Sequence, residues 1–231
     1  MPPPTLPERL AAATERPLVV FGAGGLGREV LLLLRQINAA APTWNLRGFY
    51  DDQPPATPTV AGLPYLGTAA DLNATTEPLA VAVAVGSPAG RAAVVARLTS
   101  AQLSFPALVH PGVDLQPHQH VQLGAGCLIQ RGCVLTCDIS LGRFVFLNAC
   151  CTVGHDTRLG DFCSLMPHTN LGGGAHLELG AYLGTQSTVI QGVRIGAHSV
   201  LGAGAVAVRD IPPRCTAVGV PARIIKIRNE E

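Results

Sequence analysis

The 231-residue sequence has almost no net charge and no long apolar segment. Sixteen Lys and Arg residues balance fifteen Asp and Glu residues, which leaves a formal charge of +1 at pH 7. No basic stripe interleaved with aromatic residues is present, so nothing favours a nucleic-acid partner. The apolar run at residues 30–34 is ended by Arg35 and is too short to cross a bilayer. Residues 1–4 do not resemble a secretory signal, and we therefore expect a cytoplasmic protein without a membrane partner.

The seven cysteines lack the pairing that a zinc site requires. The sequence contains no CxxC motif, which argues against a structural zinc ion. His118 and His120 form an HxH pair, but no third ligand accompanies them. We expect no metal site.

One aliphatic residue recurs at every sixth position through the second half of the sequence. A helix returns to one face every 3.6 residues and a strand every two, so neither explains this period. A three-sided β-helix does, because each six-residue unit supplies one short strand and its corner, and three units complete an 18-residue coil. The positions are Leu123, Ile129, Leu135, Leu141, Leu147, Val153, Leu159, Leu165, Leu171, Leu177, Leu183, Val189, Ile195 and Leu201.

A second set of mostly small residues stands two positions before each aliphatic residue. Alternation along a strand sends both sets inward, which suits a narrow triangular core. Glycine often follows the aliphatic residue, as at Gly124, Gly142 and Gly160, and we expect it to permit a sharp corner. Four cysteines occupy the small inward position and are expected to be core residues: Cys127, Cys133, Cys151 and Cys163. Cys137, Cys150 and Cys215 lie outside this register and receive no role.

The first half alternates between strands and helices. We expect strands over residues 18–21 and 79–85 and one ending near residue 50, with helices over 28–38, 68–72 and 91–99. This order predicts a small Rossmann-like α/β domain over residues 1–106, with a poorly ordered or helical lead-in over 1–16. The parallel β-helix then follows over residues 107–231, with a C-terminal tail containing a short helix at most.

A GxGxxG motif, Gly22, Gly24 and Gly27, lies between the first strand and the first helix. Such a loop lets a phosphate approach the backbone at a positive helix N-terminus. Asp51 and Asp52 follow the next strand, where an acidic side chain can meet a ribose hydroxyl. Only half of a dinucleotide fold fits before the solenoid, which favours a nucleotide-linked substrate over a dinucleotide. A glycine-rich turn kept for packing is the alternative.

His155 and Asp156 fall on a corner of the predicted solenoid and should point outward. Residues 172–174 are three glycines one coil later, so Gly173 should stack on His155 at about the strand spacing of 4.8 Å. A histidine beside bare backbone N–H groups can act as general base next to an oxyanion donor, which is the chemistry of acyl transfer. A solvated surface histidine is the alternative, since His168 and His198 occupy similar corners.

Several motifs occur in an order that resembles the bacterial sugar acetyltransferases of the sialic-acid O-acetyltransferase type. That family includes the N-acetyltransferases of UDP-4-amino sugars in the bacillosamine pathway and of GDP-perosamine. The resemblance covers nearly the whole sequence. The motifs are residues 22–27, Gly48-Phe49-Tyr50-Asp51-Asp52, Val85-Gly86, Gly154-His155-Asp156, Leu159-Gly160-Asp161-Phe162 and residues 218–223.

The resemblance implies a left-handed β-helix and a homotrimer, with acetyl-CoA as co-substrate in the groove between two solenoids. His155 would be the general base and Asp156 the acidic neighbour that holds it, with Gly173 as donor to the acetyl carbonyl. Asn148 and Thr185 would lie along the acetyl-CoA groove. No bound cofactor is implied.

In the N-terminal domain, the resemblance assigns nucleotide-sugar contacts to Gly24, Gly25, Asp51, Asp52 and Gly86. Two positions depart from it. Leu26 replaces a histidine that several members carry in the glycine loop, and the substrate contact there is lost or changed. Ser164 stands where bacillosamine-type enzymes carry a second histidine near the thioester, and is expected to donate a hydrogen bond to acetyl-CoA.

The predicted function is acetyl transfer to the amine or hydroxyl of a nucleotide-linked sugar in surface glycan biosynthesis. A sialic-acid-type O-acetyltransferase and a non-catalytic nucleotide-binding solenoid remain alternatives. A nucleotide-dependent oxidoreductase rests on GxGxxG alone. The basic residues near the C-terminus could meet the phosphates of CoA: Arg209, Arg214, Arg223 and Lys226.

Overall fold

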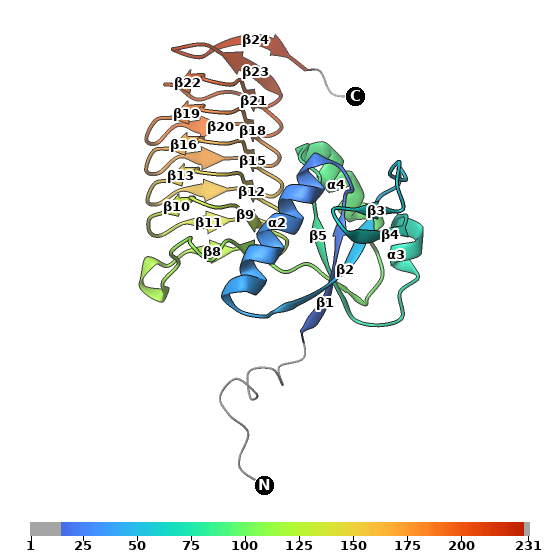
Figure 1. The fold of residues 1–231 in the computed structure, drawn as a ribbon. Coiled ribbons are helices and arrows are strands. Elements are labelled where there is room, and N and C mark those ends of the chain that lie inside the picture. Colours follow the sequence, from blue (N-terminus) through green and yellow to red (C-terminus); the bar gives the residue numbers. More distant parts are fainter. Residues whose placement is uncertain (1–14, 229–231) are drawn as a thin grey trace, which may run out of the picture.

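The computed structural model describes residues 15–228. An N-terminal α/β domain lies beside a prism of stacked coils (Figure 1). Most of the lead-in predicted for residues 1–16 lies outside the described residues. None of the described helices is long and apolar enough to cross a bilayer.

The N-terminal domain is built on a six-stranded sheet with strand order β3-β4-β2-β1-β5-β6. All neighbouring strands pair in parallel except β3 and β4. The strands are β1 (Arg16–Phe21), β2 (Trp44–Tyr50), β3 (Thr59–Val60), β4 (Leu63–Gly67), β5 (Leu79–Val83) and β6 (Leu103–Ser104). The helices are α2 (Gly25–Ala40), α3 (Ala69–Asn73) and α4 (Pro88–Arg97).

Alternation along β1 sends its side chains to two different cores. Leu18 and Val20 pack with α2, and this core continues into the solenoid through Leu128 and Phe146. Val19 and Phe21 pack with α3 and α4 on the opposite face of the sheet. Helix α2 therefore lies between the sheet and the solenoid (Figure 1).

The predicted elements are present, but helices α2 and α4 begin earlier than expected. Helix α2 begins at Gly25 with Gly24 as its N-cap, so the last three residues of the glycine motif belong to the helix. Helix α4 begins at Pro88 because Ser87 caps it and Pro88 occupies its first turn. The Ser-Pro pair was the signal that would have placed this start correctly.

The second half folds into a parallel β-helix with three faces. Face 1 contains β9, β12, β15, β18 and β21, face 2 contains β10, β13, β16, β19 and β22, and face 3 contains β8, β11, β14, β17 and β20. A short 3₁₀ helix (Pro117–Gln119) precedes β8. The strands are β7 (Leu108–Val109), β8 (Gln122–Leu123), β9 (Leu128–Ile129), β10 (Val134–Leu135), β11 (Ser140–Leu141), β12 (Phe146–Leu147), β13 (Thr152–Val153), β14 (Arg158–Leu159), β15 (Ser164–Leu165), β16 (Asn170–Leu171), β17 (His176–Leu177), β18 (Tyr182–Leu183), β19 (Thr188–Val189), β20 (Arg194–Ile195), β21 (Val200–Leu201) and β22 (Val206–Ala207).

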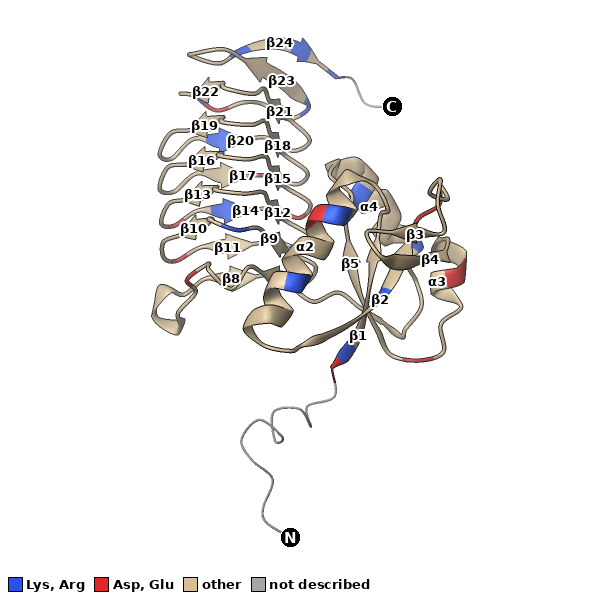
Figure 2. Cartoon of the chain, in the orientation of Figure 1, with Lys and Arg blue, Asp and Glu red and all other residues tan. Residues whose placement is uncertain are grey.

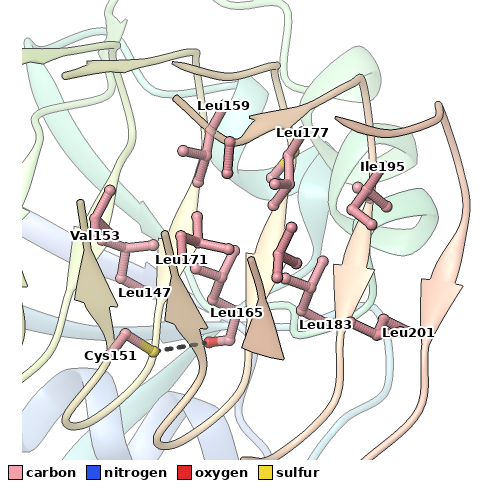
Figure 3. Close-up of a cluster of buried hydrophobic side chains, with 14 of the residues drawn as sticks. Leu147, Cys151, Val153, Leu159, Leu165, Leu171, Leu177, Leu183, Ile195 and Leu201 are labelled. Atoms are coloured by element: carbon pink, nitrogen blue, oxygen red, sulfur yellow. Dashed lines mark hydrogen bonds between the residues drawn. The ribbon is translucent and has the colours of Figure 1, made fainter. Parts of the chain in front are cut away.

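The six-residue register forms the core of the prism, as predicted. Every member of both inward sets is buried except Val121 and Leu123, which are half-buried in the first coil. Figure 3 shows the aliphatic side chains converging from the strands. The four register cysteines are among the buried residues. Cys215, which was left without a role, is also buried, on a strand that closes the last coil.

The glycines after the aliphatic residues serve a different purpose from the one expected. The left-handed backbone of each corner falls two residues later, for example at Asp138, Phe144 and Asp156, with φ of 54°, 55° and 58°. A Cβ on Gly142 would instead approach Asp161 N of the next coil to 2.6 Å. Glycine is required there because stacked backbones approach closely.

The C-terminal tail forms strands, and the short helix allowed for it is absent from the described residues. Strand β23 (Cys215–Val218) continues face 1 in parallel with β21, and β24 (Arg223–Ile227) pairs antiparallel with β23. The pair covers the open end of the prism (Figure 1). The Pro-rich segment before it does not end the sheet, because Ile211 still bridges to Ile195.

A core truncation tests the register against a matched surface truncation two residues away. Leu177 is fully buried, whereas Leu179 is 45% exposed. We expect Leu177→Ala to lower the free energy of unfolding by about 2–5 kcal/mol. Leu179→Ala should lower it by less than about 1 kcal/mol. Denaturant unfolding measures both, and equal losses would contradict the inward assignment.

Candidate active site

The candidate catalytic residues lie on the corner between faces 2 and 3. The chain leaves β13 at Val153, turns through residues 154–157 and enters β14. His155 and Asp156 point to solvent, with side chains 66% and 67% exposed. A core role for His155 is thereby excluded.

Asp156 is oriented toward the imidazole of His155. The backbone of Asp156 is left-handed, with φ of 58°, and its side chain points toward the preceding residue. Asp156 Oδ2 lies 2.8 Å from His155 Nδ1. A carboxylate accepts a hydrogen bond, so this contact favours the proton on Nδ1 and leaves Nε2 with a free lone pair. His155 is thus presented as a base at Nε2.

Gly173 lies against the imidazole from the coil above. The two coils are tied by the bond from Gly174 N–H to His155 O, at 2.7 Å. A Cβ on Gly173 would lie 2.5 Å from His155 Nε2, so only glycine leaves room for the ring. The stacking predicted from the 18-residue coil is present.

Among the described residues, the Gly173 N–H has no recorded protein acceptor. At the same position of other corners, a side chain accepts this bond: Asp161 from Arg143 N, Asn148 from Ala149 N and Glu178 from Ala197 N. The run of glycines at 172–174 provides no such side chain. A free backbone donor therefore stands beside a free imidazole nitrogen, which suits acyl transfer.

Asn148 and Thr185 lie on a different corner, between faces 1 and 2. Thr185 is exposed, and Asn148 is half-buried with its Oδ1 accepting from Ala149 N at 2.7 Å. Face 2 separates this corner from His155. Within one chain, Asn148 and Thr185 do not meet the predicted base, whereas Gly173 does.

Ser164 does not fit the role expected for it. Its side chain is fully buried on face 1 beneath the N-terminal domain. Ser164 Oγ accepts from Arg91 Nη2 at 2.9 Å and donates to Gly86 O at 3.1 Å. The hydroxyl is committed to the joint between the domains and is not accessible to acetyl-CoA in this chain.

The glycine loop divides into packing glycines and open glycines. A Cβ on Gly22 would lie 2.6 Å from Ala84 O, and one on Gly27 would overlap Gly22 O. Gly24 has nothing within 4 Å of its Cβ position, and Gly25 only the end of the Arg28 side chain at 3.9 Å. Packing explains the first pair but not the second, which leaves room for a ligand at the N-terminus of α2.

The two aspartates after β2 face different neighbours. Asp51 Oδ2 accepts from Ala23 N at 2.7 Å and so supports the glycine loop. Asp52 accepts from Arg97 at 2.6 Å and from Ala69 N at 3.1 Å. Partial burial raises the pKa of Asp52, but these hydrogen bonds and the Arg97 charge outweigh it and lower the pKa below its usual value. Asp51 Oδ1 also accepts from Gln53 N at 2.9 Å, so both carboxylates are hydrogen-bonded. Asp51 faces the glycine loop, whereas Asp52 makes an ion pair with Arg97.

Leu26 and Gly86 complete the loop cluster. Half-buried Leu26 packs into the core shared with the solenoid, and its side chain would lie 3.7 Å from a Cβ on Gly86. Gly24, Gly25, Leu26, Asp51 and Gly86 thus gather at the carboxyl ends of β1, β2 and β5, where open α/β sheets bind ligands.

Within residues 15–228, no three His, Cys, Asp or Glu side chains are placed to hold a metal ion. His120 of the HxH pair instead contacts Asp138, with 3.1 Å between Nδ1 and Oδ1. Burial raises the pKa of the Cys163 thiol to about 12 and that of Cys127 to about 11. These thiols are protonated at neutral pH.

Comparison with known proteins finds similarity along most of the chain. Residues 17–98 match the PglD N-terminal domain family. The structure of PerB from Caulobacter crescentus, in complex with CoA and GDP-perosamine, is 32% identical, with a TM-score of 0.81 over 93% of this chain and 99% of that one. The chain belongs to the hexapeptide-repeat sugar acetyltransferases.

Two further relatives agree with this assignment. The acetyltransferase domain of PglB from Neisseria gonorrhoeae, in complex with acetyl coenzyme A, is 29% identical, with a TM-score of 0.82 over 91% of this chain and all of that one. GDP-perosamine N-acetyltransferase from Escherichia coli O157:H7 is 29% identical over 90% of this chain and 95% of its own length. The left-handed β-helix implied by the resemblance is confirmed.

Sequence reasoning did not single out Arg91. It lies on α4, is 1% exposed and reaches from the N-terminal domain to the solenoid. The sequence did contain a signal for this role. Arg91 is the one charged residue among residues 89–96, which are otherwise small or apolar, and a charged side chain in such a helix needs partners if it is buried.

Gly173→Ala tests whether the bare backbone beside His155 matters to this sugar acetyltransferase. The φ of Gly173 is outside the left-handed region, so alanine is compatible with the backbone. Its methyl group would displace the exposed imidazole. We expect acetyl transfer to fall at least about tenfold while the unfolding temperature stays near that of the wild type. Unchanged turnover would separate Gly173 from the reaction.

Proposed function

We propose that this chain is an acetyl-CoA-dependent N-acetyltransferase that acts on the amine of a nucleotide-linked amino sugar. One observation carries the proposal: His155 Nε2 lies against the bare Gly173 backbone while Asp156 occupies Nδ1. The relatives described above are N-acetyltransferases or acetyltransferase domains, and the one from Caulobacter crescentus holds CoA and GDP-perosamine. These similarities favour an amine over a hydroxyl as the acceptor.

His155 begins the reaction by accepting a proton. The acceptor nitrogen attacks the carbonyl carbon of the thioester and forms the C–N bond, while His155 Nε2 takes a proton from that nitrogen. The Gly173 N–H donates to the oxyanion that develops on the carbonyl oxygen. The C–S bond then breaks, and CoA leaves with the proton from the imidazolium. Asp156 keeps the imidazole oriented throughout.

The N-terminal domain binds the nucleotide part of the acceptor. Gly24 and Gly25 leave the N-terminus of α2 open, and this is where a helix attracts phosphate. Asp51 and Gly86 border the same loop. We assign the nucleotide diphosphate to this edge of the sheet, in a pathway of surface glycan synthesis. The cytoplasmic location expected from the sequence stays a prediction.

The active site needs two copies of the chain. The nucleotide loop and Leu26 lie against face 1, Asn148 and Thr185 lie on the corner between faces 1 and 2, and His155 lies on the corner beyond face 2. In a homotrimer, the His155 corner of one subunit can lie against the Thr185 corner of the next subunit. This arrangement brings His155 together with the nucleotide loop and the acetyl-CoA contacts of that neighbour. Acetyl-CoA then lies in the groove between two solenoids.

Removing the base should stop the reaction without unfolding the protein. We expect His155→Ala to lower kcat at least about a hundredfold, because a positioned base contributes about 10²–10⁴-fold. Asp156→Asn should cost less, since it affects only orientation. His120→Ala is the matched control, because it removes an exposed histidine that also contacts an aspartate, Asp138. Initial rates with acetyl-CoA and a nucleotide 4-amino sugar measure the effect. Wild-type turnover in His155→Ala would remove the histidine from the mechanism.

A charge placed on the glycine loop tests the phosphate assignment. Gly24 is the N-cap of α2 with extended backbone, and both Asp and Asn favour that position. Gly24→Asp adds a negative charge where the diphosphate is expected and should raise the acceptor KM at least about tenfold. Gly24→Asn has the same shape without the charge and should raise it much less. Equal KM values for the two variants would exclude phosphate from this edge.

Mixed oligomers test whether two copies share the site. His155→Ala chains lack the base and Gly24→Asp chains bind the acceptor weakly. At an acceptor concentration well below KM both are impaired, and their co-expressed hetero-oligomers contain some intact sites. Random assembly into trimers should restore about a quarter of the wild-type activity. Separately purified proteins provide the baseline. A site complete within one chain would give no recovery above that baseline.

A further inference from the structure

Arg91 is a fully buried cation whose recorded partners are all uncharged. Its guanidinium donates to five backbone carbonyls and one hydroxyl. Burial lowers the pKa of Arg91 to about 10, and it remains charged at neutral pH. Removing a charge from water is costly, so such a side chain persists only where its donors are well satisfied.

The partners of Arg91 belong to two different parts of the fold. Nε donates to Phe144 O at 2.9 Å, and Nη2 donates to Phe162 O at 2.8 Å, both on solenoid corners. Nη1 donates to Val85 O at 2.7 Å and to Gly86 O at 3.2 Å, in the loop after β5. The Arg91 side chain thus joins the loop after β5 to the solenoid.

Ser164 bonds to both Arg91 and Gly86 and so completes a cyclic hydrogen-bond network. Its hydroxyl accepts from Arg91 Nη2 and donates to Gly86 O, at 2.9 Å and 3.1 Å. The carbonyl of Gly86 therefore receives two hydrogen bonds from the same side. Both donors are shielded from solvent, because Ser164 is fully buried and Arg91 is 1% exposed.

Fixing the Gly86 carbonyl also fixes the amide that follows it. In a trans peptide the N–H of Ser87 points opposite to the C=O of Gly86, and so away from Arg91 and Ser164. Ser87 begins the capped end of α4 and lines a cavity of about 240 Å³ with Tyr182 and His198 of the solenoid. Gly86, on the other side of the same peptide, borders the glycine loop, because a Cβ on it would lie 3.7 Å from the Leu26 side chain.

We propose that Arg91 is a positioning residue that sets the Gly86-Ser87 peptide for binding of the nucleotide-linked acceptor. Ser164 is its partner in this role. The inference rests on the proposed function for the identity of the ligand, but not for the position of the peptide. The competing explanation is that Arg91 only joins the two domains. In that case, its substitution should not change the acceptor KM more than the acetyl-CoA KM.

Arg91→Lys keeps the charge but loses the planar fork that reaches both sets of carbonyls. Ser164→Ala keeps Arg91 and removes one bond to Gly86 O. Arg143→Met is the matched control, because Arg143 lies at the same joint, 5.5 Å from the Phe144 ring, without contacting Gly86. The purified full-length proteins are compared for KM of acceptor, KM of acetyl-CoA and unfolding temperature. Hydrogen exchange of residues 84–90 is followed without substrate.

We expect Arg91→Lys to raise the acceptor KM about tenfold, with the acetyl-CoA KM within about twofold of wild type. Ser164→Ala should shift the acceptor KM in the same direction by a smaller factor, and Arg143→Met should change neither. Both positioning variants should exchange the hydrogen-bonded amides that flank this peptide, those of Ala84 and Gly90, faster than the control. Equal shifts in both KM values, or no shift in a folded variant, would reduce Arg91 to a clamp.

The exchange measurement separates this inference from the proposed function. If the wild type acetylates no nucleotide-linked amino sugar, the proposed function fails, and the exchange of the Ala84 and Gly90 amides alone decides the role of Arg91. Faster exchange in Arg91→Lys and Ser164→Ala supports positioning. Exchange equal to that of Arg143→Met overturns it.

Discussion

The stacking of backbone upon backbone at an 18-residue interval is the constraint on which this protein depends. Each coil hydrogen-bonds to the next through two-residue strands on all three faces. Because stacked backbones meet at the corners, side chains there are either excluded, as at Gly142, or forced outward, as at His155. The core needs only one aliphatic and one small residue in every six, so the exterior is free to vary. Figure 2 shows that charged residues are sparse and scattered over both domains on the side in view.

The proposed chemistry uses two consequences of this stacking. Residues eighteen apart become neighbours, which sets Gly173 beside His155 without any contact along the chain. Corners on different faces stay apart, which separates His155 from Thr185 and from the nucleotide loop. The first consequence places the proposed base and the proposed oxyanion donor side by side in a single chain. The second is why we propose that neighbouring subunits complete the site.

Periodicity made most of the solenoid predictable, whereas contacts between residues far apart in the sequence could not be predicted. The repeat alone placed the core and the outward corner of His155. It could not show that Ser164 lies under the N-terminal domain, because domain docking leaves no period in the sequence. The position of Asp52 in the sequence predicts a ribose ligand, but its carboxylate pairs with Arg97, which is far away in the sequence. Arg91 required the same long-range information, since its acceptors are backbone carbonyls that any residue could supply.

A crystal structure with acetyl-CoA bound tests the central claim most directly. The account predicts that the thioester carbonyl oxygen lies within about 3.2 Å of Gly173 N, with the carbonyl carbon open to an acceptor beside His155 Nε2. A thioester bound on another corner, or a carbonyl oxygen turned away from the Gly173 N–H, would contradict it.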